Sequence, residues 1–365
     1  MNYYEKELRA LQRSGRFRSR EIVATKLHDF ASNDYLGLAE KHELCKAACR
    51  RLERADVHAP KASLLVGGYH KEHYAFERAL CEANGFEDGV VVGSGFAANI
   101  ALIEALVRKG DVLLMDASYH ASGVLASNIG RIEKELFAHN DMEHLEALLK
   151  KYHDKKRRIV AVEGVYSMEG DLVPKEVFEL CERYDAILIV DEAHSSGVVG
   201  ENLLGVYDLY DIKIAPNHIK MGTLGKAYGS FGAYILASEH IVSYLLNRAK
   251  PLIYATALSL YDTVLAHESL LYIQEHKERL KAEVESRQRL ARESFGIEMH
   301  SLILPIPIGD NRRVVEIKRA LEAKGFAIGA IREPTVPSAI LRIIARLGED
   351  AETFEELLKA LRNYF

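Results

Sequence analysis

The stretch Ala186-Ile187-Leu188-Ile189-Val190-Asp191-Glu192-Ala193-His194 decides the fold, because an uninterrupted apolar run ends here in an acid and a histidine. Such a run predicts a parallel strand that is buried on both faces. Ligands of open parallel sheets bind beyond the carboxyl ends of the strands. We therefore expect Asp191 and His194 to face a ligand.

Lys226 stands further along the chain in Thr223-Leu224-Gly225-Lys226-Ala227, between two strand-like segments at 219–222 and 232–236. A lysine on a glycine-flanked loop is by itself most often a solvated charge. Beside an aspartate and a histidine from a neighbouring strand end, it suits the chemistry of pyridoxal phosphate (PLP). A lysine can form a Schiff base with this cofactor, and an aspartate can keep the pyridinium nitrogen protonated so that the ring accepts electrons.

Strand-like and helix-like segments alternate from about residue 41 to residue 240. The strand-like runs are 90–92, 112–115, 159–162 and 187–190, and the helix-like segments between them include 97–108 and 142–152. This alternation predicts an α/β fold with a mostly parallel sheet flanked by helices.

The pattern changes after a long helical stretch at about 258–294. Strand-like runs at 302–308 and 341–345 then alternate with helix-like segments at 312–324 and 351–364, which predicts a smaller C-terminal α+β domain. A further helix is expected at 3–14. The predicted division is an N-terminal helix and arm at 1–40, a large cofactor-binding domain at 41–250 and a small C-terminal domain at 251–365.

The composition is that of a globular protein, with 48% hydrophobic and 28% charged residues in a chain of 365. A net charge of −5, with both signs interspersed, gives no reason to expect a nucleic-acid partner. Four arginines between Arg13 and Arg20 are the local exception. They suit either the steering of an acidic substrate or a solvated flank.

Neither a metal site nor a membrane segment is expected. The four cysteines lack paired metal-ligand spacing; they are Cys45, Cys49, Cys81 and Cys181. The N-terminal residues contain no apolar signal core, and no stretch reaches transmembrane length. A cytoplasmic location is the resulting expectation.

Two motifs suggest nucleotide chemistry instead. Gly93-Ser94-Gly95-Phe96-Ala97-Ala98 is a G-x-G-x-x-A turn, and Asp116 follows at a distance typical of the ribose-binding acid in a dinucleotide fold. A nicotinamide oxidoreductase therefore stays open, although the same turn can hold the phosphate of PLP. The DEAH segment at 191–194 resembles a Walker B box, but no G-x-x-x-x-G-K-[ST] occurs in the chain, which excludes a P-loop nucleotide hydrolase.

Further motifs stand in a fixed order along the chain. They are Phe30-Ala31-Ser32-Asn33-Asp34-Tyr35-Leu36-Gly37-Leu38, Ser94 to Asn99, Phe137 to Asp141 and Glu163 to Asp171. Together with the segments around Asp191 and Lys226, they resemble the α-oxoamine synthases, which are PLP enzymes of fold type I. The resemblance covers most of the chain, and the segment 331–337 is similar to the branch of this family that serves biotin synthesis.

The resemblance implies a role for each matching residue. Lys226 would form the Schiff base and then act as general base, and Asp191 would pair with the pyridinium nitrogen. His120 would stack on the cofactor ring. His194 and Ser167 would reach its phenolic oxygen or the incoming acyl carbonyl.

The resemblance also implies a phosphate site and a partner. Gly95, Phe96 and Thr223 would surround the phosphate of PLP. Members of the family share their active sites between two subunits, so Thr256 would contact the phosphate held by the partner subunit. A homodimer is therefore the implied active unit.

The implied reaction is a decarboxylative condensation of L-alanine with a pimeloyl thioester, which yields 8-amino-7-oxononanoate. A sibling enzyme that joins glycine or serine to another acyl-CoA is the first alternative. A fold-type I aminotransferase or lyase is the second, and a PLP-binding protein without catalysis is the third. The motifs decide neither the acyl carrier, which is CoA or acyl-carrier protein, nor the length of the acyl chain.

The chain departs from the family in its substrate-binding segments. The segment 58–69 holds fewer glycines than the loop of the family, and its Leu64-Leu65 pair suggests an apolar wall. The carboxylate-binding arginine of the family falls at Ile344. Arg342 or Arg346 would replace it, because alternate residues of a strand share a face, and Arg342 ranks slightly ahead. Arg18 matches the position expected to meet the distal carboxylate of a pimeloyl group.

Overall fold

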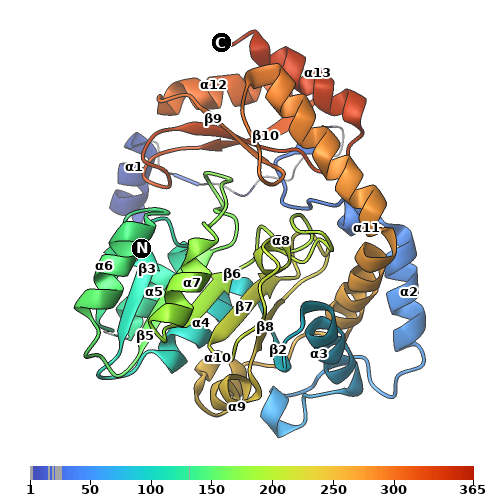
Figure 1. The fold of residues 1–365 in the computed structure, drawn as a ribbon. Coiled ribbons are helices and arrows are strands. Elements are labelled where there is room, and N and C mark those ends of the chain that lie inside the picture. Colours follow the sequence, from blue (N-terminus) through green and yellow to red (C-terminus); the bar gives the residue numbers. More distant parts are fainter. Residues whose placement is uncertain (1–2, 15–16, 19, 21–26, 131) are drawn as a thin grey trace.

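A seven-stranded sheet forms the middle of the larger part of the molecule (Figure 1). The computed structural model describes residues 3–14, 17–18, 20, 27–130 and 132–365. In spatial order the strands are β2 (Asp88–Val92), β8 (Ala233–Ala237), β7 (His218–Thr223), β6 (Ile187–Asp191), β5 (Arg158–Glu163), β3 (Val112–Asp116) and β4 (Lys134–Phe137). Among these described strands only β8 runs antiparallel to its neighbours, so the predicted mostly parallel sheet is confirmed.

Helices cover both faces of this sheet. Successive side chains of a strand point to opposite sides, so the apolar strands have two faces to bury. In β5, Ile159 and Ala161 join one core, whereas Val160 and Val162 join the other. The first core also contains residues of α4 (Gly95–Leu106), α5 (Ala121–Ile129), α9 (Glu239–Arg248) and α10 (Lys250–Ile253). The second contains residues of α3 (Lys71–Asn84), α6 (Met142–Lys151), α7 (Glu176–Arg183) and α8 (Val206–Leu209).

A second, four-stranded sheet has the order β1 (His28–Phe30), β10 (Phe326–Ile331), β11 (Ile340–Ile344) and β9 (Ile303–Pro307). The N-terminal strand β1 pairs in parallel with β10, with Phe30 opposite Ile328. Phe30 is fully buried and packs against Phe326 and Phe354. The sheet is covered by α12 (Asn311–Glu322) and α13 (Ala351–Arg362), which confirms the predicted smaller α+β region.

The longest helix, α11 (Leu260–Phe295), extends from the large sheet to the small one (Figure 1). It packs against α2 (His42–Leu52) and α3 at one end and against α13 at the other. Its capping agrees with the sequence, since Ser259 accepts a hydrogen bond from the N–H of Asp262 and Gly296 ends the helix in the left-handed region. The helical stretch expected at about 258–294 is confirmed.

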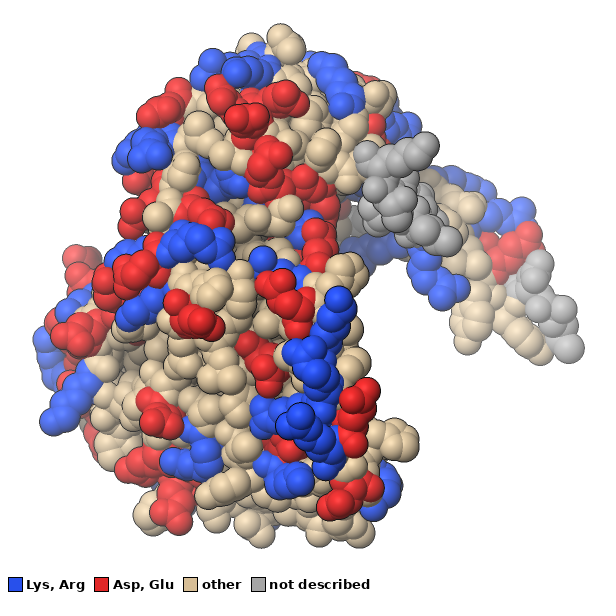
Figure 2. All heavy atoms as spheres, turned by 90° about the vertical axis from the view of Figure 1, so that its right-hand side faces the viewer, with Lys and Arg blue, Asp and Glu red and all other residues tan. Residues whose placement is uncertain are grey.

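The N-terminal helix α1 (Glu5–Arg13) is present where a helix was expected, and it buries none of its residues. On the face of the molecule that carries α2 and α11, acidic and basic side chains are interspersed (Figure 2). Within the described residues, no helix is both long enough and apolar enough to cross a membrane.

Candidate active site

The ends of three neighbouring strands bring the predicted residues together. Glu163 at the end of β5 pairs in register with Asp191 at the end of β6, which in turn lies opposite Met221 of β7. Lys226 follows β7 on the loop that leads to β8. The cluster therefore lies at the carboxyl edge of the sheet, where open α/β sheets bind their ligands.

The loop that carries Lys226 is held by its own backbone. Gly229 donates to the carbonyl of Lys226, and the N–H of Leu224 bonds to the carbonyl of Gly232. Gly229 has a φ of 57°, and a Cβ atom there would collide with the backbone of Leu38 and Ala39. Only glycine fits this close approach without strain, which explains why a glycine follows the lysine at this distance.

The amine of Lys226 lies 2.7 Å from Nε2 of His194. Burial lowers the pKa of Lys226 to about 8, although the carboxyl groups of Asp191 and Glu163 act in the opposite direction. A substantial share of this amine is therefore neutral slightly above neutral pH. A neutral amine is the form that attacks a carbonyl group or accepts a proton.

His194 is almost completely buried and also contacts the hydroxyl of Tyr35, which lies 2.5 Å from its Nδ1 atom. Burial lowers the pKa of His194 well below its usual range, and the nearby Lys226 and Arg342 lower it further. His194 is consequently a neutral imidazole that links Lys226 to Tyr35.

Asp191 is buried and accepts hydrogen bonds on both carboxylate oxygens. Its Oδ2 accepts from the side-chain amide of Asn99 at 2.8 Å, and its Oδ1 accepts from the N–H of Ala193 at 3.0 Å. Asn99 is itself oriented by the hydroxyl of Tyr119, which donates to its Oδ1 at 2.6 Å. A carboxylate held in this way keeps acceptor sites for a cationic N–H group of a ligand.

Glu163 is a second buried carboxyl group beside Asp191. Its Oε2 accepts from the N–H of Ser167 at 3.2 Å, and its Oε1 has no hydrogen-bond partner among the described residues. Burial, and after it the neighbouring Asp191, raise the pKa of Glu163 well above its usual range. The sequence contains no signal for a role of Glu163 beyond its place directly after the predicted strand 159–162.

His120 and Ser167 lie at the border of this cluster. His120 caps α5, with Nδ1 accepting the N–H of Ser122 at 3.2 Å, and part of its side chain is open to solvent. Partial burial lowers its pKa, with Lys226 acting in the same direction and Asp191 opposing. Ser167 uses its backbone: its N–H contacts Glu163 and its carbonyl accepts from Arg342.

The start of α4 adjoins Thr223. Ser94 caps the helix by accepting from the N–H of Ala97 at 3.1 Å, and a Cβ atom at Gly95 would lie 3.7 Å from that of Thr223. The N–H groups of Gly95 and Phe96 form no hydrogen bond with any described residue. The hydroxyl of Thr223 beside them donates to the carbonyl of Gly232 at 3.1 Å, so the free donors here are the two N–H groups. Free N–H groups at a helix start match the donors that a phosphate group requires.

The two candidate arginines on β11 differ in their surroundings. Arg342 donates from Nε to the carbonyl of Ser167 at 2.7 Å and from Nη1 to Oδ1 of Asn33 at 3.0 Å, while its buried Nη2 has no partner among the described residues. Arg346 is fully buried. It pairs with three carboxylates, those of Asp29, Asp34 and Glu40. Only Arg342 keeps a donor for a ligand.

The remaining predicted residues lie outside this cluster. Thr256 is exposed and forms an isolated bridge with Ser63, and none of its contacts within the described part of the chain is with Lys226 or Asp191. Arg18 is exposed to solvent. Ile344, where the family would place its arginine, is fully buried in β11.

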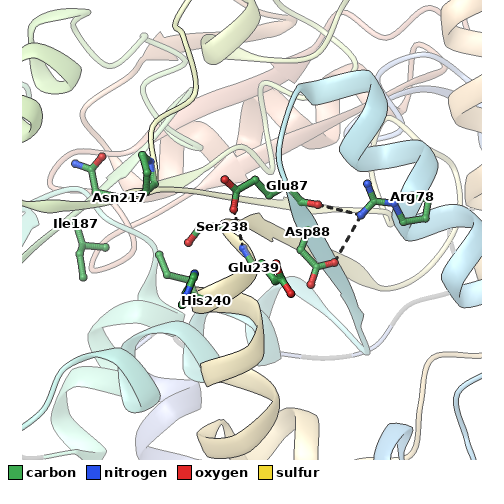
Figure 3. A pocket seen from close by; sticks show the side chains of 10 residues that line it. Arg78, Glu87, Asp88, Ile187, Asn217, Ser238, Glu239 and His240 are labelled. Carbon is green, nitrogen blue, oxygen red and sulfur yellow. Dashed lines mark hydrogen bonds and ion pairs between the residues drawn. The ribbon is translucent and has the colours of Figure 1, made fainter.

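A cavity of about 1000 Å³ lies near the other ends of the strands (Figure 3). It is lined by the starts of β2 and β6 and by the first residues of α9. Arg78 spans part of it, 3.8 Å from Asp88 and 2.9 Å from the carbonyl of Glu87. None of the residues around Lys226 lines it, so it is separate from the candidate site. In the described residues no group of side chains is arranged to hold a metal ion.

Comparison with known proteins shows the family of the chain. The family described as "Aminotransferase class I and II" matches residues 25–361. An 8-amino-7-oxononanoate synthase of Helicobacter pylori strain J99 is 41% identical over 99% of this chain and 97% of its own length. Another, from Geobacter sulfurreducens, is 35% identical over 92% of this chain and 90% of its own length.

Solved structures show the same fold. A serine palmitoyltransferase of Sphingomonas wittichii superimposes with a TM-score of 0.89 at 23% identity, covering 100% of this chain and 98% of that one. An 8-amino-7-oxononanoate synthase of Francisella tularensis gives a TM-score of 0.78 at 24% identity, covering 93% of this chain and 97% of that one. A variant of the serine palmitoyltransferase of S. paucimobilis was solved with a PLP–myriocin aldimine bound. It has a TM-score of 0.89 at 23% identity and covers 99% of this chain and 97% of that one.

Proposed function

Because the chain belongs to the aminotransferase class I and II family, we propose that it condenses L-alanine with a pimeloyl thioester to form 8-amino-7-oxononanoate. The fold is that of a fold-type I PLP enzyme, and the chain is an α-oxoamine synthase with PLP as its cofactor. The choice of substrates is the finer part of the proposal. Relatives named for this synthase, up to 41% identical over nearly the full length, support it.

The residues at the carboxyl edge of the sheet fit PLP. Lys226 offers a partly neutral amine, and Asp191 offers a carboxylate for the ring nitrogen. The free N–H groups at the start of α4, with Thr223 beside them, fit the phosphate. Asp191 and Lys226 both act on the pKa of His120, which therefore lies near them, and we assign His120 to the ring face.

When bound, PLP supplies an electron sink that spreads negative charge from the carbon that reacts. The other tasks fall to the side chains. Arg342 holds the carboxylate of alanine through its free Nη2 donor, with Asn33 beside it. Lys226 then accepts the α-proton at Nζ, since burial keeps part of this amine neutral. Arg346 does not bind the carboxylate of alanine, because its three carboxylate partners occupy its donors.

His194 and Ser167 complete the proposed catalytic set. Nε2 of His194 lies within hydrogen-bond distance of the amine of Lys226, and burial keeps the imidazole neutral. The hydroxyl of Ser167 is available for the acyl carbonyl, because the backbone of this residue makes the contacts with Glu163 and Arg342. The net reaction releases carbon dioxide and the thiol of the carrier, which is either CoA or acyl-carrier protein.

The proposed active unit is a homodimer in which Thr256 reaches the phosphate bound by the partner subunit. Large apolar side chains that are exposed on this segment and on the one bridged to it support it; they are Leu65, Val66 and Tyr254. Val66 lies close to Ser63, which bridges to Thr256. Exposed apolar patches of this kind mark protein interfaces. Arg18, also exposed, is proposed to meet the distal carboxylate of the pimeloyl chain, and the enzyme is proposed to act in the cytoplasm.

The contact between Lys226 and His194 beside Asp191 is the observation that carries the proposal. The test is to load the protein with PLP, reduce it with borohydride and find the modified lysine by mass spectrometry. We expect the label on Lys226, loss of the label in Lys226→Ala, and its retention in Lys213→Ala, an exposed lysine before β7.

The substrates are tested by product analysis. Incubation with L-alanine and pimeloyl-CoA or pimeloyl-acyl-carrier protein should release carbon dioxide and give the mass of 8-amino-7-oxononanoate. Products formed only from glycine or serine with other acyl-CoA compounds would assign the chain to a sibling branch. Amino-group transfer without use of a thioester would indicate an aminotransferase instead.

A further inference from the structure

A continuous set of polar contacts joins the amine of Lys226 to the guanidinium of Arg342. From Lys226 it passes through the imidazole of His194 to the hydroxyl of Tyr35, over 2.7 Å and 2.5 Å. The same hydroxyl lies 3.4 Å from Oδ1 of Asn33, which accepts from Arg342 at 3.0 Å. Tyr35 stands at the centre of this set and is fully buried.

The hydroxyl of Tyr35 has one hydrogen and two neighbours that can accept it. If the hydrogen points to Nδ1 of His194, the ring proton lies on Nε2, which then donates to a neutral amine of Lys226. If the hydrogen points to Oδ1 of Asn33, Nδ1 carries the ring proton and donates to the tyrosine oxygen. In that case Nε2 is free to accept from the ammonium form of Lys226.

His194 and Tyr35 both stay neutral in this exchange, so that between them only the arrangement of protons changes. His194 stays neutral because burial lowers its pKa well below the usual range. Tyr35 stays protonated because burial raises its pKa to about 12. The ring of His194 is therefore restricted to its two neutral tautomers, and the orientation of one hydroxyl decides between them.

We propose that Tyr35 is a positioning residue whose hydroxyl selects the tautomer of His194 and thereby sets which protonation state of Lys226 is stabilised. Since Tyr35 shares Asn33 with Arg342, the proposed carboxylate site and the amine are linked through the same hydroxyl. The inference rests on the proposed role of Lys226 and adds a residue that acts on this amine through His194.

Other titratable or charged groups lie near Lys226, and the test has to keep them unchanged. They come from four further segments: Asp191 of β6, Glu163 of β5, Arg342 of β11 and His120 at the start of α5. Replacing Tyr35 by phenylalanine removes one oxygen and leaves all of these in place. The aromatic ring, which belongs to the main core, keeps its packing.

The first measurement compares Tyr35→Phe with wild type in the full-length chain freed of cofactor. In the variant a proton on Nδ1 of His194 would lack a buried acceptor, so the tautomer with the proton on Nε2 prevails. The ammonium of Lys226 then loses its acceptor. We expect the pH midpoint of PLP capture, followed by absorbance, to fall by about one unit below that of wild type.

The matched control is Tyr207→Phe. Tyr207 is also buried, and its hydroxyl donates to a backbone carbonyl, that of Ile219, without contacting His194 or Lys226. The pH midpoint of PLP capture in Tyr207→Phe should stay at the wild-type value.

In the loaded enzyme, Tyr35→Phe should lower kcat about tenfold with little change in the KM for L-alanine, as expected for a group that acts through the proton-accepting residue.

A second measurement does not depend on the Tyr35→Phe variant. Nitrogen-15 NMR of labelled histidines in the wild-type chain, with His194 assigned by its loss in His194→Gln, reports the tautomer directly. The proposal requires the main tautomer to change as pH passes through the capture midpoint. A tautomer that is constant from pH 6 to pH 10 would overturn the role of Tyr35 even in a fully active enzyme, and an unshifted midpoint in Tyr35→Phe would do the same. Failure to bind PLP at all would instead overturn the proposed function.

Discussion

Glu163 and Asp191 end two neighbouring strands in the same register, so that two buried carboxyl groups lie side by side at the edge of the sheet. Asp191 receives hydrogen bonds from Asn99 and from its own loop, whereas Glu163 keeps one oxygen without a partner in the described residues. Two like charges in one dry site disfavour each other. Burial, and after it the neighbouring Asp191, raise the pKa of Glu163 well above its usual range, so Glu163 is the neutral acid of the pair.

Glu163→Gln is expected to change how stability depends on pH. The folded-state pKa of Glu163 is raised, so unfolding releases a proton once the pH exceeds the ordinary value of about 4.5. The stability that the protonated group contributes is present below that pH and is lost as pH rises toward the folded-state pKa, by up to about 1.4 kcal/mol per unit. Glutamine stays neutral, so the unfolding free energy of the variant should increase relative to that of wild type as the pH rises. Urea unfolding between pH 5 and pH 8 measures this difference.

The control for this experiment is Glu169→Gln, which alters an exposed glutamate on the same connection after β5. Its unfolding free energy should follow the wild-type pH profile. Parallel profiles for wild type and Glu163→Gln would show that Glu163 is ionised in the folded protein and contradict the assignment.

Arg342→Lys is expected to weaken alanine binding and to leave PLP binding unchanged. A lysine cannot reproduce the planar donors of a guanidinium, of which Nη2 is the free one. Loss of one charge-assisted hydrogen bond costs about 1.5–3 kcal/mol, so the KM for L-alanine should rise about ten- to a hundredfold. Steady-state kinetics and PLP content measure the two effects separately, with Arg313→Lys, an exposed change on α12, as control.

Arg346→Met tests the contrasting role of the neighbouring arginine. Removing this buried cation leaves Asp29, Asp34 and Glu40 without their shared partner, which should cost about 3–5 kcal/mol of unfolding free energy. Thermal and urea unfolding of the cofactor-free chain measure the loss. A variant that stays as stable as wild type but shows a raised KM for L-alanine would instead move the carboxylate site to Arg346.

The sequence predicted elements whose pattern is local and missed relationships between distant segments. The strands around 112–115, 159–162 and 187–190 were found because continuous apolar runs are typical of buried parallel strands. The pairing of β1 with β10 could not be predicted, since it joins segments about three hundred residues apart.

The same distinction applies to the site. Asp191 and Lys226 could be chosen because strand ends and glycine-flanked loops mark ligand positions, and the structure brings both to one edge. Tyr35 could not be chosen from spacing, because its contact with His194 spans 159 positions. The strand pattern predicts the same face for Arg342 and Arg346 and so does not distinguish them. The acidic partners of Arg346 do, and these come from an N-terminal segment.

The proposed dimer predicts that one exposed apolar residue controls both assembly and cofactor binding. Val66 is 75% exposed and follows Ser63, which bridges to Thr256. Such a side chain at an interface core is buried by the partner, so Val66→Glu would place an unpaired charge there. Light scattering should give about twice 41.0 kDa for wild type and the monomer mass for the variant. PLP affinity should fall with dissociation, because the contact from Thr256 is lost.

Leu136→Glu, on the edge strand β4, should remain dimeric. A monomeric wild type, or a Val66→Glu dimer with undiminished PLP affinity, would contradict the shared site.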